Sequence, residues 1–265
     1  MTAAATPPHL LRLRQVCLAV PFLARVVDDL QAIFGLSVCH RDPGLAAYGL
    51  ENALLPVGTD FLEVVSPIQA DTAAGRFIQR TCGHGGYMAI FQVDDPRRRQ
   101  AAAAALDVRT AHQIDQPDYQ SVQLHPRDCR AAFIELGRSL GGELRTGAWW
   151  PAGAHWQQHV RTDATRRLQG ILLESPDPPA LAAHWSRILD TPLSADAAAP
   201  VLHIEQTQIG FVTGPSDVLG SVILEVADVQ ATLQRAIDCG HRVEGECFHL
   251  GGVYFQVRAC TPEVG

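Results

Sequence analysis

The chain has 265 residues, a formal net charge of −7 and 47% hydrophobic residues, as expected for a globular protein with one large domain or two ordinary ones. The negative charge argues against nucleic acid or an anionic membrane as a partner. All 21 basic residues are arginine. Chemistry that needs a lysine is therefore excluded, including pyridoxal phosphate anchoring, and we expect no nucleotide cofactor of the P-loop kind.

Seven cysteines are scattered along the chain without a CxxC pair, which favours reduced thiols in a cytoplasmic protein. The N-terminal stretch MTAAATPPHLLRLRQ lacks the apolar segment of a secretory signal, and no apolar run reaches the length of a membrane span. We expect a cytoplasmic protein with a small-molecule partner. Whether it is a monomer or a homodimer is left open.

The first structural unit begins with LRQVCLAV (13–20), which has the apolar content of a strand. The following PFLARVVDDLQAIFG places apolar residues at helical spacing and ends at a glycine. Three strand-like segments come next, LSVCHRD, YGLENALLPV and TDFLEVVSP, separated by turn residues. The predicted order is one strand, one helix and three strands.

This order recurs along the chain. The second unit begins with GYMAIFQVDD (86–95), the third with LQGILLESPD (168–177) and the fourth with GSVILEVAD (220–228), and each is followed by a helical stretch and further strands. The repeat predicts an α+β fold of four βαβββ modules. One curved face of each sheet is left without a helix, so two neighbouring modules enclose a cleft where a ligand would lie.

Residues 137–167 interrupt the repeat. They are rich in glycine and contain Trp149, Trp150 and Trp156, three of the four tryptophans of the chain. We predict a first domain over 10–136, a linker over 137–167 and a second, degenerate domain over 168–260. The tryptophans would fill the groove between the domains or form a lid over a planar ligand.

One charged residue stands in the middle of an apolar strand. In GTDFLEVVSP, Glu63 shares a strand face with Phe61 and Val65. If that face is buried, the ionised carboxylate needs a cation, a metal ion or several donors, or else it takes up a proton. If the face is exposed, it needs none of these. Glu135 in AAFIELG has the equivalent position in the second unit, which favours a shared role.

The fourfold series, with QVCLAVPFL as first strand, IFGL at a helix end and GTDFLEVVSP as fourth strand, resembles the vicinal oxygen chelate superfamily. That superfamily includes glyoxalases, extradiol dioxygenases, epimerases and bleomycin-resistance proteins. The segments GLENALLPVGTDFLEVVSP and VQLHPRDCRAAFIEL are most similar to its glyoxalase-like and bleomycin-resistance-like branch. The resemblance covers nearly the whole chain and is stronger over 11–136 than over 168–260. It implies two glyoxalase-like domains whose curved mixed sheets enclose a cleft.

Enzymes of this superfamily bind one divalent metal ion in the cleft. Carried over by position, the resemblance implies Gln15, Glu63 and Glu135 as metal ligands. The fourth position falls on Met88, or on Tyr87 if the register slips by one, and neither is a usual ligand for a hard cation. The implied ion is manganese, magnesium, zinc or iron, with zinc less favoured because imidazole is lacking.

The resemblance implies a lyase, isomerase or epimerase that acts on a small carbonyl compound in the cleft of 10–136, with Glu63 and Glu135 as catalytic residues. Without a metal, the two carboxylates could share a proton. The alternative is a metal-free protein that binds or sequesters a small molecule, as bleomycin-resistance proteins do. The second half offers no comparable set, and its Glu225 has no partner in the pattern. The residues expected to contact a substrate are His125, Arg127, Tyr87, Met88 and Phe61.

Overall fold

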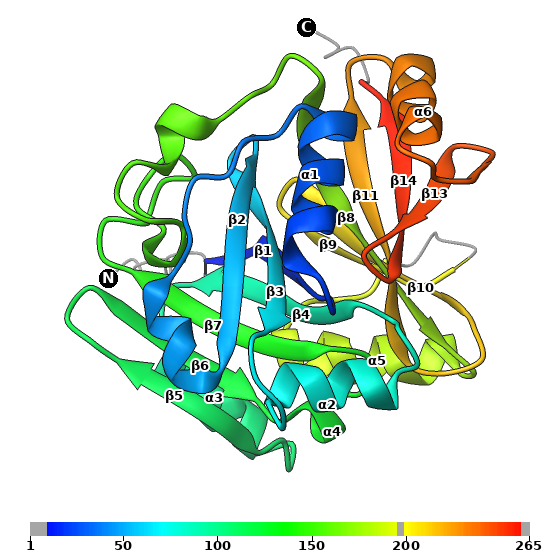
Figure 1. The fold of residues 1–265 in the computed structure, drawn as a ribbon. Coiled ribbons are helices and arrows are strands. Elements are labelled where there is room, and N and C mark those ends of the chain that lie inside the picture. Colours follow the sequence, from blue (N-terminus) through cyan, green and yellow to red (C-terminus); the bar gives the residue numbers. More distant parts are fainter. Residues whose placement is uncertain (1–9, 195–198, 261–265) are drawn as a thin grey trace, which may run out of the picture.

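The computed structural model describes residues 10–194 and 199–260. Its elements follow the predicted fourfold order (Figure 1). The first module has one strand, one helix and two full strands, because the segment expected as a strand over 36–42 forms only an isolated bridge between His40 and Leu54. Its elements are β1 (Leu11–Ala19), α1 (Leu23–Phe34), the short helix η1 (Pro43–Tyr48), β2 (Leu50–Val57) and β3 (Asp60–Pro67).

A helix that the sequence pattern did not predict, α2 (Ala73–Arg80), separates the first module from the second. The second module is complete and also contains the short helix α4. Its elements are β4 (Gly86–Val93), α3 (Pro96–Ala104), β5 (Thr110–Asp115), β6 (Tyr119–Leu124), α4 (Pro126–Cys129) and β7 (Phe133–Ser139).

The segment between the two halves contains two short helices, η2 (Trp150–Ala152) and η3 (Trp156–His159). The third and fourth modules follow it. They consist of β8 (Thr165–Ser175), α5 (Pro178–Leu189), β9 (Val201–Ile204), β10 (Thr207–Thr213), β11 (Val218–Val226), α6 (Val229–Asp238), β12 (Val243–Glu244), β13 (Cys247–Leu250) and β14 (Val253–Ala259).

The acidic starts of the module helices act as caps. The side chains of Asp95, Asp177 and Asp228 each accept a hydrogen bond from a backbone N–H in the first turn of α3, α5 and α6. Proline follows Asp95 and Asp177 as the first helical residue, where it sacrifices no hydrogen bond. The helix α1 ends at Gly35, whose φ of 67° fits a glycine cap.

Strand pairing makes two curved, mixed half-barrels. In every module the first strand runs parallel to the last, as in the pairs β1/β3, β4/β7, β8/β10 and β11/β14. The modules of each half join through the antiparallel pairs β1/β4 and β8/β11. A bridge between Gly86 of β4 and Leu219 of β11 links the two halves. The predicted α+β fold of βαβββ modules is confirmed.

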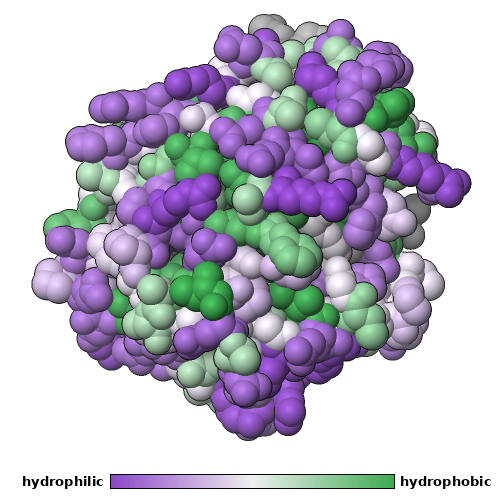
Figure 2. Space-filling model, in the orientation of Figure 1, coloured by the Kyte–Doolittle hydropathy of each residue, from purple (hydrophilic) through white to green (hydrophobic). Residues whose placement is uncertain are grey.

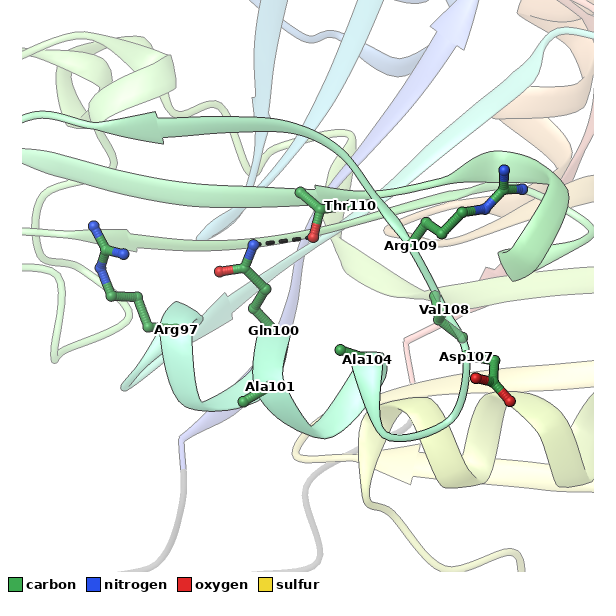
Figure 3. A pocket seen from close by; sticks show the side chains of 8 residues that line it. All are labelled: Arg97, Gln100, Ala101, Ala104, Asp107, Val108, Arg109 and Thr110. Carbon is green, nitrogen blue, oxygen red and sulfur yellow. Dashed lines mark hydrogen bonds between the residues drawn. The ribbon is translucent and has the colours of Figure 1, made fainter.

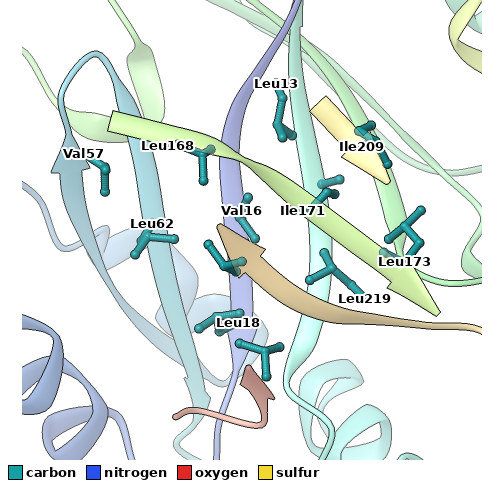
Figure 4. Packing of buried hydrophobic residues seen from close by; sticks show 14 of the residues in the cluster. Leu13, Val16, Leu18, Val57, Leu62, Leu168, Ile171, Leu173, Ile209 and Leu219 are labelled. Atoms are coloured by element: carbon teal, nitrogen blue, oxygen red, sulfur yellow. The ribbon is translucent and has the colours of Figure 1, made fainter. Parts of the chain in front are cut away.

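The main hydrophobic core lies between the two halves. Figure 4 shows β8 and β11 crossing over β1, β3 and β4, with Val16 and Leu62 facing Leu168 and Ile171. Val16 and Leu62 point to the face of the first sheet that also carries α1. The second half therefore covers the helix side of the first half-barrel, and the opposite, concave side is left for a site.

Hydrophobic and hydrophilic side chains alternate over one face of the molecule. On the face shown in Figure 2, hydrophobic patches are broken up by hydrophilic side chains. None of the helices in the described part of the chain combines the length and hydrophobicity that a membrane span requires.

Candidate functional site

The concave face of the first half-barrel carries a second buried cluster, formed by residues of β1, β2, β3, β4 and β6. Two segments outside the modules close it. Ala74 and Phe77 of α2 belong to the cluster, and so do Trp149 and Trp156 of the connecting segment, with 0% and 2% of their surface exposed. Trp156 packs edge-on against Phe61, with the ring centroids 5.0 Å apart. These two tryptophans fill the cleft of the first half-barrel, rather than the groove between the domains.

Glu63 lies on this concave face and is 9% exposed. Its Oε2 accepts a hydrogen bond from Gln15 Nε2 at 2.8 Å, and its Oε1 accepts one from Asn52 Nδ2 at 2.7 Å. Cys17, the strand partner of Glu63 across β1 and β3, places its thiol against the same carboxylate. The buried carboxylate is therefore held by donors, which answers the question that the apolar strand raised.

A second hydrogen bond fixes the orientation of each amide group, that of Gln15 and that of Asn52. Gln15 Oε1 accepts a hydrogen bond from Trp149 Nε1 at 2.8 Å, and Asn52 Oδ1 accepts one from the backbone N–H of Asp42 at 2.8 Å. Both partners are donors only, so they require an oxygen to face them. Each amide consequently turns its NH₂ group toward Glu63.

Glu135 occupies the matching place in the second module and is 6% exposed. Its Oε1 accepts a hydrogen bond from the Tyr119 hydroxyl at 2.7 Å, and its Oε2 accepts one from Gln123 Nε2 at 2.8 Å. Both donors come from β6, which pairs with β7 beside Glu135. The two carboxylates thus have separate sets of donors, and each interacts electrostatically with Cys17.

Strand register assigns the fourth ligand position of the superfamily pattern. Cys17 is the parallel strand partner of Glu63, and Gln15 lies two residues before Cys17. In the second module, Met88 precedes by two residues Ile90, the parallel strand partner of Glu135. Met88 is therefore the structural counterpart of Gln15.

Burial is the main cause of the shifted pKa values in this region. It raises the pKa of Glu63, against the opposing hydrogen bonds from Asn52, Cys17 and Gln15, and the charge of Glu135 adds to the rise. Burial and the Glu63 carboxylate raise the pKa of Cys17 well above its usual range. The fold thus favours the neutral forms of both groups.

The arrangement does not fit the divalent metal ion that the superfamily resemblance implies. A cation beside Glu63 would meet the N–H hydrogens of two amide groups, and the amide oxygen of Gln15 is bound to Trp149. Met88 offers only a thioether at the fourth position. Among the residues that the structure describes, no group of three or more His, Cys, Asp or Glu side chains is placed to hold a metal. Metal ligation by Gln15, Glu63 and Glu135 stays a prediction that these contacts do not support.

His125 and Arg127 do not join the carboxylates. His125 Nδ1 lies 3.4 Å from Arg109 Nη2, beside the ion pair between Arg109 and Asp128, and Arg127 is exposed. None of the hydrogen bonds in the described residues connects either of them to Glu63 or Glu135. Their role in substrate binding stays a prediction.

The other residues expected at a substrate belong to the walls of the cleft. Tyr87 packs between the rings of Phe77 and Phe133, with centroids 4.8 and 4.9 Å away, and burial raises its pKa. Phe61 is fully buried. Tyr87 and Met88 keep 7% and 8% of their surface exposed. Tyr87 and Met88 are thus exposed to solvent only slightly, as Glu63 is.

A buried arginine stands beside this cluster. A register shift in the β1/β4 pairing falls at Arg14, and bulges of this kind redirect a side chain. The Arg14 guanidinium lies over the rings of Phe61, Trp149 and Trp156, at 5.2 to 5.8 Å from their centroids. It also lies 3.7 Å from Asp60. Burial lowers the pKa of Arg14 to about 10 and raises that of Asp60 to about 6.

The described part of the second half holds one buried carboxylate of similar placement, Glu225. It accepts hydrogen bonds from Gln169 Nε2 at 2.9 Å and Arg167 Nε at 2.9 Å. An ion pair therefore compensates the charge of this carboxylate. A large hollow of about 680 Å³ lies elsewhere, along α3 and β5, with Arg97 and Arg109 at its opposite ends (Figure 3). Both arginines are already paired with aspartates.

The partners of the two carboxylates were missed by sequence reasoning. Asn52, Tyr119 and Gln123 share the concave face through simple strand alternation, so the pattern could have suggested them. Trp149 was considered only as a lid or groove filler, and no local pattern indicates its bond to Gln15.

Comparisons with known proteins agree with this fold. No protein-family model matches the chain. Human mitochondrial methylmalonyl-CoA epimerase is 24% identical over 132 residues, which cover 47% of this chain and 72% of that protein. The mouse enzyme is also 24% identical, over 133 residues.

Two solved structures superimpose over most of the chain. A hypothetical protein from Staphylococcus aureus has a TM-score of 0.66 at 11% identity and covers 95% of this chain and 100% of its own. A mutant of 4-hydroxymandelate synthase from Streptomyces coelicolor has a TM-score of 0.65 at 14% identity and covers 91% of this chain and 78% of its own. The chain thus has the two-domain glyoxalase-like fold. Its distant similarity to methylmalonyl-CoA epimerase agrees with the resemblance to the vicinal oxygen chelate superfamily that the sequence indicated.

Proposed function

We propose that the first half-barrel catalyses a proton transfer without a metal ion, as a lyase, isomerase or epimerase of a small carbonyl compound. The observation that supports this most directly is the environment of Glu63. Its two oxygens accept amide N–H groups, and it lies on the concave face with 9% of its surface exposed. Burial raises the pKa of this carboxyl, which makes the carboxylate a stronger base toward a C–H bond.

In this proposal Glu63 removes a proton from the carbon next to the carbonyl group. The electron pair of the C–H bond moves to the carbonyl oxygen and forms an enolate. Gln15 Nε2 has a second N–H, for which the described hydrogen bonds contain no acceptor, and this N–H is available to the enolate oxygen. Delivery of a proton to the opposite face of the same carbon gives the epimer, and delivery to another position of the enolate gives the isomer.

The similarity to methylmalonyl-CoA epimerase supports a substrate with an acidic C–H bond beside a carbonyl group. The test is hydrogen–deuterium exchange followed by proton NMR in D₂O. The probes are methylmalonyl-CoA and the thiol adduct of a 2-oxoaldehyde, each with chelator-treated protein. We expect loss of the α-proton signal, unaffected by the chelator and abolished in Glu63→Gln. The matched control is Glu51→Gln, because Glu51 is an exposed residue of β2.

A second function is the binding of a small molecule without turnover. The aromatic side chains of Phe61, Trp149 and Trp156 at the cleft support it, because they offer apolar contact surface to a ligand. Exchange that appears only after a divalent cation is added would contradict the metal-free mechanism. No exchange of either probe, with or without a cation, would leave the binding function as the better explanation.

A further inference from the structure

A cavity of about 460 Å³ lies on the outer side of the segment that closes the cleft. It is bounded by the chain before and at the start of η1, by the ends of β6 and β7, and by the turn around η2. Trp149 separates it from Gln15. Its lining consists of His40, Asp42, Pro43, Asp118, Ser139, Leu140, Ala148, Trp149, Trp150, Pro151, Gly153 and Ala154.

The charges around this cavity have one sign. Asp42 and Asp118 contribute carboxylates, and none of the 21 arginines of the chain lines it. No ion pair of either aspartate occurs in the described residues. Asp42 Oδ1 accepts the N–H of Gly44 at 2.8 Å, which leaves its second oxygen for another partner. The cavity is therefore negative at its rim.

An aromatic side chain of the lining, that of Trp150, is held in place by its neighbours. Trp150 stacks on Tyr119 with the ring centroids 5.1 Å apart and the planes 10° apart. Its backbone N–H donates to Ser139 Oγ at 2.9 Å, and Tyr119 is itself anchored to Glu135. Trp150 nevertheless keeps 40% of its surface exposed, and the neighbouring Leu140 keeps 62%. The indole of Trp150 and the side chain of Leu140 thus face solvent inside a hollow, where a ligand that buried them would be stabilised by the hydrophobic effect.

We propose that this cavity binds a small planar organic cation. Its volume lies within the usual range of about 300 to 1,000 Å³ for small-molecule sites. The exposed indole supplies a surface for stacking and for a cation–π contact, which contributes about 0.5 to 2 kcal/mol. Asp42 and Asp118 supply the opposite charge, and Leu140 covers the apolar part of the ligand. This site is separate from Glu63 and does not depend on the proposed proton transfer.

The test compares three probes of similar shape by isothermal titration calorimetry at pH 8. They are 1-methylquinolinium, the neutral 2-methylquinoline and the anionic quinoline-2-carboxylate. We expect the cation to bind at least about tenfold more tightly than the neutral probe, since one charge contact and one cation–π contact differ between them. The anion should not bind. The affinity for the cation should fall as salt is added.

Two variants locate the binding. Asp118→Asn should weaken the cation about three- to tenfold and leave the neutral probe unchanged, whereas Trp150→Leu should weaken both. Asp118 is exposed and its side chain has no hydrogen bond among the described contacts, so the variant keeps the fold. Asp107→Asn, in the hollow beside α3, is the matched control. Equal affinity for the cation and the neutral probe, equal effects of the Asp118 and Asp107 variants, or no binding of the cation at millimolar concentration would overturn the proposal.

Discussion

Replacement of Trp149 by phenylalanine tests the contact on which the assignment of the Glu63 site rests. Trp149 is fully buried, and its indole N–H donates to Gln15 Oε1 at 2.8 Å. Phenylalanine cannot donate, so the buried amide oxygen loses its partner, at a cost of about 1 to 3 kcal/mol. The smaller ring also leaves a cavity, which adds about 1 to 2 kcal/mol. We expect Trp149→Phe to lower the free energy of unfolding by about 2 to 5 kcal/mol.

Trp156→Phe separates the two contributions. Trp156 is 2% exposed and loses the same part of its ring, but its indole N–H makes a longer bond, 3.2 Å, to the Gly147 carbonyl oxygen. Trp149→Phe should therefore be the more destabilising by about 1 to 2 kcal/mol. The assay is urea unfolding followed by circular dichroism.

A double-mutant cycle isolates the bond itself. Gln15→Met removes the acceptor and keeps most of the side-chain volume, so Trp149→Phe should cost less in that background. We expect a coupling energy of about 1 kcal/mol or more. A coupling below about 0.3 kcal/mol, or equal effects of the two tryptophan variants, would refute the orientation of Gln15 and with it the argument against a metal ligand at this position.

Three further changes probe the rest of the molecule. Tyr119→Phe removes the 2.7 Å hydrogen bond to Glu135 and should lower the free energy of unfolding in urea by about 1 to 3 kcal/mol. The control Tyr48→Phe changes an exposed residue and should alter stability by less than about 0.5 kcal/mol. Similar values for both variants would contradict the buried hydrogen bond. Gly86→Ala places a Cβ 2.1 Å from the Leu219 carbonyl oxygen, so it should disrupt the bridge between the halves. We expect the free energy of unfolding to fall by at least about 3 kcal/mol. A thermal unfolding midpoint like that of the unaltered protein would show that the halves do not approach so closely. Burial raises the pKa of Asp60 from 3.8 to about 6, so the folded chain binds this proton more tightly than the unfolded chain does. Its contribution to stability is complete below pH 3.8 and is lost as the pH rises through about 6, by about 3 kcal/mol in total. The free energy of unfolding is measured for the unaltered protein and for Asp60→Asn from about pH 4 to about pH 7. The unaltered protein should lose stability relative to the variant as the pH rises, and a stability difference independent of pH would contradict the raised pKa.

Much of the architecture could be predicted because its signals are local. Strand alternation alone places Gln15, Cys17 and Glu63 on the face opposite Val16 and Leu62. Helical spacing over 21–35 and the aspartates before α3, α5 and α6 mark helices within a few residues. The fourfold recurrence of these elements then predicted the α+β fold of βαβββ modules. The prediction of a strand over 36–42 was wrong. This segment forms an isolated bridge between His40 and Leu54 instead.

The chemistry of the site was decided by contacts between distant segments. Glu63 and Glu135 could be recognised as a pair from the sequence, but whether Glu63 holds a cation depends on which atoms of Gln15 and Asn52 face it. Trp149, 134 positions away from Gln15, fixes one amide, and the backbone of Asp42 fixes the other. An amide side chain presents either an acceptor or a donor depending on its rotation, and only a partner placed by the tertiary structure selects between them. The sequence by itself thus determined the fold and the positions of the carboxylates, whereas the tertiary structure determined that donors surround them.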